Sequence, residues 1–269
     1  MKIIRLVLWM LLVLVTPFVC SGAGASVNDD NTVTQELNDV AFHKVEVGSF
    51  FKVNFRQSDT FQVKIRISKH FFPYLVAKIE KGGLVLRIDY HSLPANYVNY
   101  NDIAIVEVTA PSFKVLEMQG ASKVELEGRW ELEELELLVS GAGKLECEEL
   151  VARNLVIRQS GASLVEAEVA VEKLDMVVEG TSKMDVENIG DRIGSQLTLK
   201  VSGASKIDLG ELPCDQVDLK VAGACKVKVF PVKRLKAEVA GASKVLYDGS
   251  SKELQKDIST MGVSSVKAF

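Results

Sequence analysis

The residues of this sequence that could do chemistry are three histidines, four cysteines and a large set of carboxylates. His43, His70 and His91 stand far apart, without the His-x-x-x-His spacing or a carboxylate at ligand spacing that a metal or catalytic site would show. The carboxylates recur at regular intervals, whereas a catalytic pair would be a local departure from a repeat. We therefore predict no catalytic residue, no metal and no cofactor, and we predict that the protein is not an enzyme.

The amino terminus predicts export. Lys2 and Arg5 precede an apolar run that is too short for a typical membrane-spanning helix. Residues 1–25 are therefore expected to be a signal peptide, cleaved by signal peptidase I after Ala25, which closes a small-x-small sequence. The alternative is a lipoprotein modified at Cys20, although the residues before that cysteine are not small. Both routes predict an exported protein of the periplasm, the outer membrane or the cell surface.

The composition of the remaining chain limits its partners. Removal of the two basic residues of the leader leaves 30 basic against 36 acidic residues, a formal charge of −6. Phosphate binding needs a basic face, so nucleic acid is not expected as a partner. Cys147, Cys214 and Cys225 are an odd number at unrelated spacings, which does not indicate a disulfide framework. We interpret them as small buried residues.

A repeat with the sequence Gly-Ala-Ser-Lys organises the second half of the chain. Its glycines are separated by 21, 20, 19, 23, 20, 18 and 21 residues, and they are Gly120, Gly141, Gly161, Gly180, Gly203, Gly223, Gly241 and Gly262. A period of about twenty residues built from alternating strands is typical of a β-solenoid. We predict an all-β, single-stranded β-solenoid over residues 40–269, with less regular rungs in 40–114 and regular rungs in 115–269. Residues 26–39 are polar and are expected to form a linker.

Side-chain alternation predicts which repeat residues face the core, because every second residue of a strand points to the same side. Counting in twos through Gly203 places Leu199, Val201, Ser205 and Ile207 on one side. We therefore expect the chain to bend at Gly-Ala-Ser with glycine and serine inside, and the serine hydroxyls of neighbouring rungs to bond to one another. Gln159 occupies an inward position that this pattern does not explain.

The outward residues predict two charged columns. The lysine column contains Lys123, Lys144, Lys183, Lys206, Lys226 and Lys244, with Leu164 and Ser265 in the two positions that interrupt it. Two residues further along stand Glu125, Glu146, Glu166, Asp185 and Asp208. Rungs stack about 4.8 Å apart, so the acidic column would neutralise the basic one. The columns are either a solvated face that keeps the sheet soluble or a striped surface that faces a ligand.

The segments that carry this pattern resemble a known family, the bacterial head GIN domain, catalogued as "putative auto-transporter adhesin". The resemblance extends from Phe42-His43-Lys44-Val45 through Val106-Glu107-Val108-Thr109 to Val263-Ser264-Ser265-Val266, and the Gly-Ala-Ser-Lys-Val repeats are its most specific part. It implies an exported, right-handed parallel β-helix found on lipoproteins and envelope proteins. It brings no functional residues that could be carried over.

Three functions are consistent with these observations. The first is an adhesin-like binding module that presents a flat charged face to a glycan or to an envelope or host protein. The second is a structural or assembly component of the envelope without a soluble ligand, and the third, less favoured, is a carbohydrate-active enzyme, for which the regular rungs leave no room for the walls of a cleft.

Departures from the repeat are the places where binding is expected. They are Leu164 in the lysine column and the insertion of residues 91–100, in which Tyr97 and Tyr100 could stack on sugars. The alternative, which we slightly favour, is that the insertion covers the open end of the core. The strand that begins at Val266 has no obvious cap, which predicts self-association through that end of the solenoid.

Overall fold

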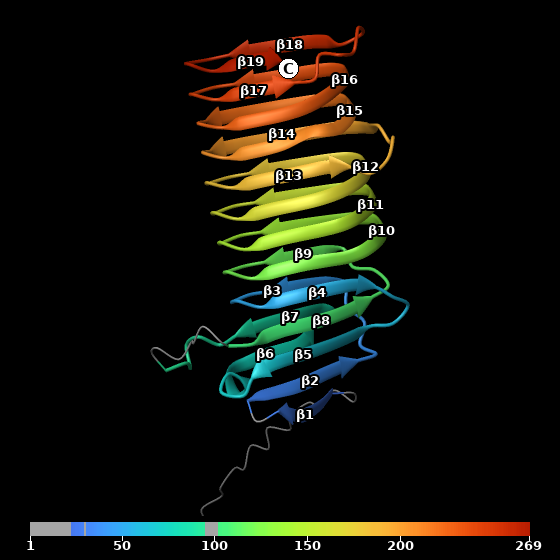
Figure 1. The fold of residues 1–269 in the computed structure, drawn as a ribbon, viewed down its shortest axis with the longest axis vertical. Coiled ribbons are helices and arrows are strands. Elements are labelled where there is room, and N and C mark those ends of the chain that lie inside the picture. The colour runs from blue at the N-terminus through green and yellow to red at the C-terminus, as the bar shows by residue number, and fades with distance from the viewer. Residues whose placement is uncertain (1–22, 30, 95–101) are drawn as a thin grey trace, which may run out of the picture.

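The computed structural model describes residues 23–29, 31–94 and 102–269, and this part of the chain is a stack of strands with a single 3-10 turn (Figure 1). The amino-terminal elements are β1 (Ala23–Asp29), β2 (Thr32–Asn38), β3 (Lys44–Val47), β4 (Lys52–Gln57), β5 (Gln62–Ser68), η1 (Phe72–Tyr74), β6 (Leu75–Glu80), β7 (Gly83–Ile88), β8 (Ala104–Ala110) and β9 (Val115–Met118). The regular part contains β10 (Lys123–Val139), β11 (Lys144–Gln159), β12 (Leu164–Val178), β13 (Lys183–Asn188), β14 (Gly194–Gly203), β15 (Lys206–Gly223), β16 (Lys226–Val239), β17 (Lys244–Tyr247), β18 (Gln255–Thr260) and β19 (Ser265–Ala268).

Some predictions concern residues outside the described part. The predicted leader up to residue 22, with Cys20, lies there, as do Tyr97 and Tyr100. β1 begins at Ala23 and contains the predicted cleavage position. Among the described residues, no helix has the length and apolar character needed to cross a membrane.

The predicted β-solenoid is confirmed by the parallel register of successive rungs. β10, β11 and β12 stack in order, with Lys123 beside Lys144 and Leu137 beside Ile157. The same parallel pairing continues from β12 through β13 and β14 to β19. Each long strand runs from one glycine corner toward the next, so one rung is one repeat.

The glycine corner differs from the prediction. The repeat glycines are exposed and have φ between +77° and +104°, whereas the residues two positions later are buried in all but the last corner, where Ser264 is half-buried. Glycine is therefore required by the left-handed backbone and by the rung below, not by a crowded interior. At Gly161, an added Cβ would lie 2.5 Å from the carbonyl oxygen of Gly141. The Ala162 N–H donates to that same oxygen at 2.8 Å, which holds the two corners in contact.

The buried serines bond to the corner backbone and not to one another, contrary to the prediction. The Ser205 hydroxyl donates to the Gly180 carbonyl and accepts from the Ser182 N–H, both at 3.2 Å. Cys225 occupies the same position, with its Sγ 3.5 Å from the Gly203 carbonyl. A hydroxyl satisfied by two backbone groups of the rung below costs little to bury.

The inward position of Gln159 is also explained by hydrogen bonds to the backbone. Its side chain is buried and its Nε2 donates to the carbonyls of Ser163, at 2.9 Å, and Lys183, at 3.2 Å. The side chain therefore links its own corner to the next rung. Its Oε1 has no hydrogen-bond partner among the described residues.

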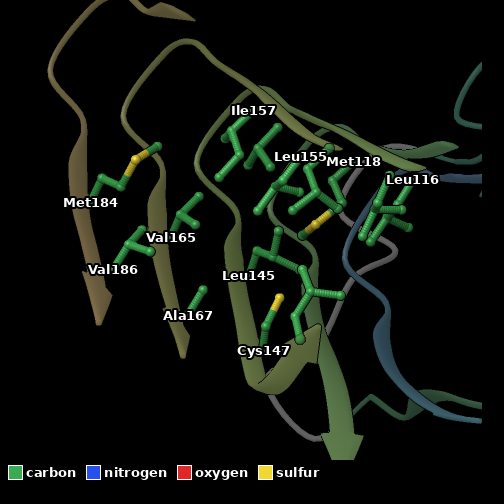
Figure 2. Close-up of a cluster of buried hydrophobic side chains, with 14 of the residues drawn as sticks. Leu116, Met118, Leu145, Cys147, Leu155, Ile157, Val165, Ala167, Met184 and Val186 are labelled. Atoms are coloured by element: carbon green, nitrogen blue, oxygen red, sulfur yellow. The ribbon is translucent and has the colours of Figure 1, made fainter. Parts of the chain in front are cut away.

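The core is a continuous column of aliphatic side chains between the two halves of each rung. Figure 2 shows part of it, in which Met118 of β9, Leu145 and Ile157 of β11, and Val165 of β12 lie among the buried side chains. The predicted burial of the cysteines is confirmed, since Cys147, Cys214 and Cys225 are buried and free. Desolvation raises the pKa of Cys147 to about 12, so this thiol stays protonated and unreactive.

The solenoid begins earlier than the explicit repeat. β3 and β4 form a rung in which Ser49, at φ +71°, takes the place of the glycine, and its carbonyl accepts from the Ala121 N–H at 2.8 Å. Parallel pairing continues to β7 and β8. β6 and β5 then run antiparallel to these strands, so residues 40–114 are only partly built of rungs.

The expected linker contains two strands. β2 pairs antiparallel with β5, opposite Val63 and Ile67, and β1 pairs with β2. Val33 and Leu37 of β2 are buried on the face that it shares with β5. Because Gln35 interrupts the apolar alternation between them, the sequence alone predicts a polar linker here and not a strand.

β6 and β7 form a tight hairpin at Lys81 and Gly82. β6 and β7 pair antiparallel from Leu75 opposite Ile88 to Glu80 opposite Gly83. Lys81 and Gly82 form the two-residue loop, both with positive φ. This backbone is the one that matches the twist of two adjoining strands.

Candidate functional site

The lysine column is in register along one face of the solenoid, which we call the ladder face. It consists of the outward side chains of the strands that follow each corner. In the register of neighbouring strands, Lys123 lies beside Lys144, Lys206 beside Lys226, and Lys226 beside Lys244. The structure adds Lys52 to the column, because Lys52 of β4 lies beside Lys123 of β10. The sequence signal for it was its position three residues after Ser49, the residue that replaces the corner glycine.

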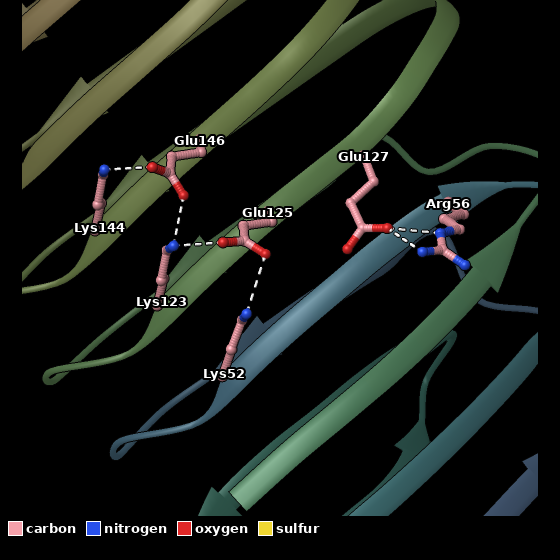
Figure 3. A network of polar contacts seen from close by, with 7 residues as sticks. All are labelled: Lys52, Arg56, Lys123, Glu125, Glu127, Lys144 and Glu146. Carbon is pink, nitrogen blue, oxygen red and sulfur yellow. Dashed lines mark hydrogen bonds and ion pairs between the residues drawn. The ribbon is translucent and has the colours of Figure 1, made fainter.

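In the first rungs of the ladder face Glu125 and Glu146 each bridge two lysines, whereas Glu127 pairs with Arg56 (Figure 3). Lys123 forms ion pairs with Glu125 and with Glu146, the latter at 2.7 Å. Lys144 repeats the arrangement with Glu146 and, at 2.9 Å, with Glu166. The predicted neutralisation of the two columns is therefore present in these rungs, and it links the rungs to one another.

The two predicted interruptions of the column lie where expected. Leu164 is half-buried and stands between Lys144 and Lys183. Both lysines reach Glu166, Lys183 at 3.6 Å, so the ladder continues past the leucine. Ser265 stands beside Lys244 at the other interruption.

The pKa of Glu146 is lowered to about 2 because Lys123 and Lys144 both donate hydrogen bonds to it. The pKa of Lys123 is raised because it donates to Glu125 and Glu146. A carboxylate whose pKa is lower in the folded than in the unfolded chain stabilises the fold above its unfolded pKa. That contribution is lost as the pH falls from about 4.3, the ordinary pKa of glutamate, toward about 2.

Glu146→Gln is therefore expected to lower the free energy of unfolding at neutral pH by about 1 kcal/mol or less, because the pairs are exposed to solvent. The variant should also lose less stability than the parent between pH about 6 and pH about 3. Urea unfolding at several pH values measures both effects. Glu133→Gln is the control, because Glu133 is 85% exposed and its ion pair with Arg153 is long at 4.0 Å. Equal acid sensitivity of Glu146→Gln and the parent would show that the ladder adds no stability.

The ladder face has an acidic region, which adjoins this network, and a basic region. The acidic region is an open groove of about 540 Å³ over β10 to β13, lined mainly by carboxylates. Glu168, Asp185 and Glu187 in it form no ion pair within the described part of the chain. The pKa of Glu187 is raised, chiefly by the charge of Glu211, which shows that carboxylates crowd together there.

The basic region lies over β15, β16, β17 and β19, and we call it the basic end. It comprises Lys206, Lys226, Lys228, Lys244 and Lys267. Lys228 pairs with Asp208 at 2.8 Å. The other four lysines have no carboxylate within ion-pair distance in residues 23–29, 31–94 and 102–269. The acidic column stops at Asp208 because Lys228, Leu246 and Lys267 occupy its next positions.

The opposite face of the solenoid is less charged. An open groove of about 490 Å³ runs beside the corners, with Ser202, Ala222 and Ala240 on its floor and Met261 at its end. Lys220 and Glu238 line this groove, and Glu238 forms ion pairs with both Lys220 and Lys236. Neither groove is enclosed, so neither resembles the deep pocket of a small-molecule site.

The histidines are not all isolated as the sequence suggested. His70 Nε2 lies 3.2 Å from Asp102 Oδ1, which joins the turn after β5 to the segment before β8. The two residues are far apart in the sequence, so spacing could not reveal the pair. No group of three histidine, cysteine, aspartate or glutamate side chains among the described residues is arranged to hold a metal ion.

Comparison with known proteins supports an adhesin-like module. A family model described as "putative auto-transporter adhesin, head GIN domain" matches residues 41–191 and 193–251. No curated protein matches the sequence.

Solved structures share the fold at low identity. One is described as a "putative lipid binding protein" from Parabacteroides distasonis, with 17% identity and a TM-score of 0.78. Others are described as putative adhesins, from Parabacteroides merdae (16%, 0.75) and Bacteroides fragilis (16%, 0.68). Each alignment covers 90% of this chain and 98% of the other. At this identity the likeness establishes the fold alone.

Proposed function

Because this chain belongs to the head GIN domain family of putative auto-transporter adhesins, we propose that it is an exported, adhesin-like binding module of the cell envelope. Its contact surface is the ladder face, and the basic end of that face receives an acidic partner. The preferred partner is an anionic glycan, and an acidic protein surface of the envelope or of a host is the alternative.

The observation that carries this proposal is the row of unpaired lysines on successive rungs. Lys206, Lys226 and Lys244 are exposed and stacked in register about 4.8 Å apart. Like charges directly opposite one another on neighbouring strands are destabilising. In the first rungs the same column is neutralised by Glu125, Glu146 and Glu166. An acidic ligand would supply the missing countercharge at the basic end.

The open shape of the surface favours an extended ligand. The lysines form a line along the solenoid axis, and the two grooves described above are open. A linear polymer with a negative charge on each unit can contact several rungs at once, whereas a small molecule requires an enclosed pocket for affinity.

The proposal is tested by binding to a polyuronate and to a sulfated polysaccharide, with a neutral polysaccharide as reference. Replacing Lys206, Lys226 and Lys244 together by glutamine should weaken binding by about tenfold or more, since each exposed charge contact contributes up to about 1 kcal/mol. Binding should also weaken as salt is added.

The matched control removes the same charge from the opposite face, with Lys200, Lys220 and Lys236 replaced by glutamine. It should leave binding within about twofold of the parent, a difference well below 1 kcal/mol. Equal losses in the two triple variants would mean that only net charge matters, and the absence of binding at low salt would reject the anionic glycan.

A structural or assembly role without a soluble ligand is the second candidate. The observation that favours it is the uncovered last rung, β18 and β19, whose outer edges have no partner strand in the described part of the chain. Recovery of the chain with one envelope protein, independent of the three lysines, would support this role over glycan binding. The third candidate, a carbohydrate-active enzyme, has no support in the family description, which names adhesins.

A further inference from the structure

The last rung of the solenoid exposes an unusual amount of apolar surface. The large hydrophobic residues that are exposed in the described structure are Tyr90, Ile193, Ile258, Met261, Val263 and Phe269. Four of these six belong to the last rung, and Val263 and Phe269 are 88% and 60% exposed. An exposed apolar cluster on one end of a protein commonly marks an interaction surface.

The backbone of this rung also offers unpaired hydrogen-bonding groups. The Met261 N–H donates to Val239 and the Ser265 N–H donates to Ser243, both in the rung below. In a strand the N–H and C=O of alternate residues point to opposite edges. The backbone groups of Ile258 in β18 and of Val266 in β19 therefore point away from the solenoid, and those of Lys256, Thr260 and Ala268 point the same way.

We infer that this end is the docking surface for a second copy of the same chain, which binds end to end and antiparallel about a twofold axis. The proposed axis is placed by two residues at equal distances from the corner at Gly262. Ile258 lies four residues before it and Val266 four residues after it, and both continue inward columns of the core. They lie on the two strands that flank the corner, so one twofold axis can pass between each of these residues and its copy in the second chain.

This axis places Ile258 opposite Ile258 of the second copy, and Val266 opposite Val266. Both are hydrogen-bonded pairs of an antiparallel ladder, because the backbone groups of these residues point to the free edge. The axis extends the core from one copy into the other, since the inward side chains meet.

Charge agrees with this register. In β18 it sets Asp257 opposite Ser259 and Lys256 opposite Thr260 of the second copy, and in β19 it sets Lys267 opposite Ser265. No two like charges are opposed. A shift of the axis by one residue away from the corner would oppose Asp257 to its own copy, and a shift by two in that direction would oppose Lys256 to its own copy, which is unfavourable.

The amino-terminal end is not an equivalent partner for this edge. There the parallel rungs are followed by the antiparallel strands β6, β5, β2 and β1 (Figure 1). A head-to-tail stack would have to join two unlike ends and could grow without limit. The twofold contact joins two identical ends and closes after two copies.

The test measures the mass of the purified chain by light scattering and sedimentation over a range of concentrations. A particle of twice the chain mass is expected. Replacing Ile258 and Val266 together by aspartate should give a monomer with an unchanged circular dichroism spectrum. Ile193→Asp is the matched control, because Ile193 is 52% exposed and lies outside the last rung, and it should remain a dimer.

A cysteine at the axis keeps the inference testable if the aspartate variant fails to fold. Ile258→Cys should form a disulfide between two copies on mild oxidation, since opposed residues of a hydrogen-bonded pair have Cα atoms about 5.5 Å apart. Ser259→Cys should not, because its opposite residue is Asp257. A monomer at all concentrations, an open series of oligomers, or equal crosslinking of the two variants would overturn the inference. None of these results depends on glycan binding.

Discussion

Gly161→Ala is expected to lower the free energy of unfolding by about 3 kcal/mol or more. The left-handed backbone at φ +84° costs a residue with a Cβ about 1–2 kcal/mol by itself. The added Cβ would also lie 2.5 Å from the carbonyl oxygen of Gly141, closer than any normal contact. Relief would require the corners to separate, which breaks the 2.8 Å bond from Ala162 to Gly141. Urea unfolding followed by circular dichroism measures the loss.

Gly128→Ala separates the two contributions. Gly128 also has a positive φ, +69°, but an added Cβ there would meet nothing within 4 Å. Its replacement is expected to cost only the backbone term of about 1–2 kcal/mol. Similar losses in the two variants would mean that stacking of the corners on one another contributes nothing beyond the left-handed conformation.

The repeat made the solenoid predictable, since a period near twenty residues and the two-residue alternation together define rungs and their inward faces. They could not show that the glycine is exposed. The alternation continues through Gly203, but the positive φ breaks the link between parity and side, and φ is not visible in the sequence. For the same reason the sequence did not reveal the rung of β3 and β4, where Ser49 adopts the positive φ that glycine has at the other corners.

The charged columns were predictable as a pattern, but their unequal pairing was not. Column membership follows from counting, and the in-register lysines bear this out. Whether a lysine keeps a countercharge depends on the residues two positions further along, both in its own rung and in the next rung. Lys228 and Leu246 replace acids there, and this small change of sequence leaves Lys226 and Lys244 unpaired. Contacts between distant segments, such as His70 with Asp102, require the folded chain.

Trp130→Ala is expected to cost about 3–5 kcal/mol, the range for removing a buried aromatic side chain. Trp130 is fully buried at the bend of β10. Its ring meets Phe113 edge to face with centroids 5.1 Å apart, and Phe113 in turn meets Phe55 at 5.6 Å. These three rings fill the junction between the first regular rung and β4. Removal of the Trp130 ring from this junction should therefore expose the backbone amides of β3 and β4 to hydrogen exchange before those of the later rungs.

Trp130→Phe tests whether shape or the indole N–H matters at this junction. In the described structure the Nε1 of Trp130 has no hydrogen-bond acceptor, and a buried unpaired donor costs about 1–3 kcal/mol. Phenylalanine keeps a ring against Phe113 and removes that donor, so the two changes should offset to within about 1.5 kcal/mol. Urea unfolding and hydrogen exchange of both variants decide the matter. If phenylalanine destabilises the chain as much as alanine does, the indole N–H must have a partner that stabilises the junction.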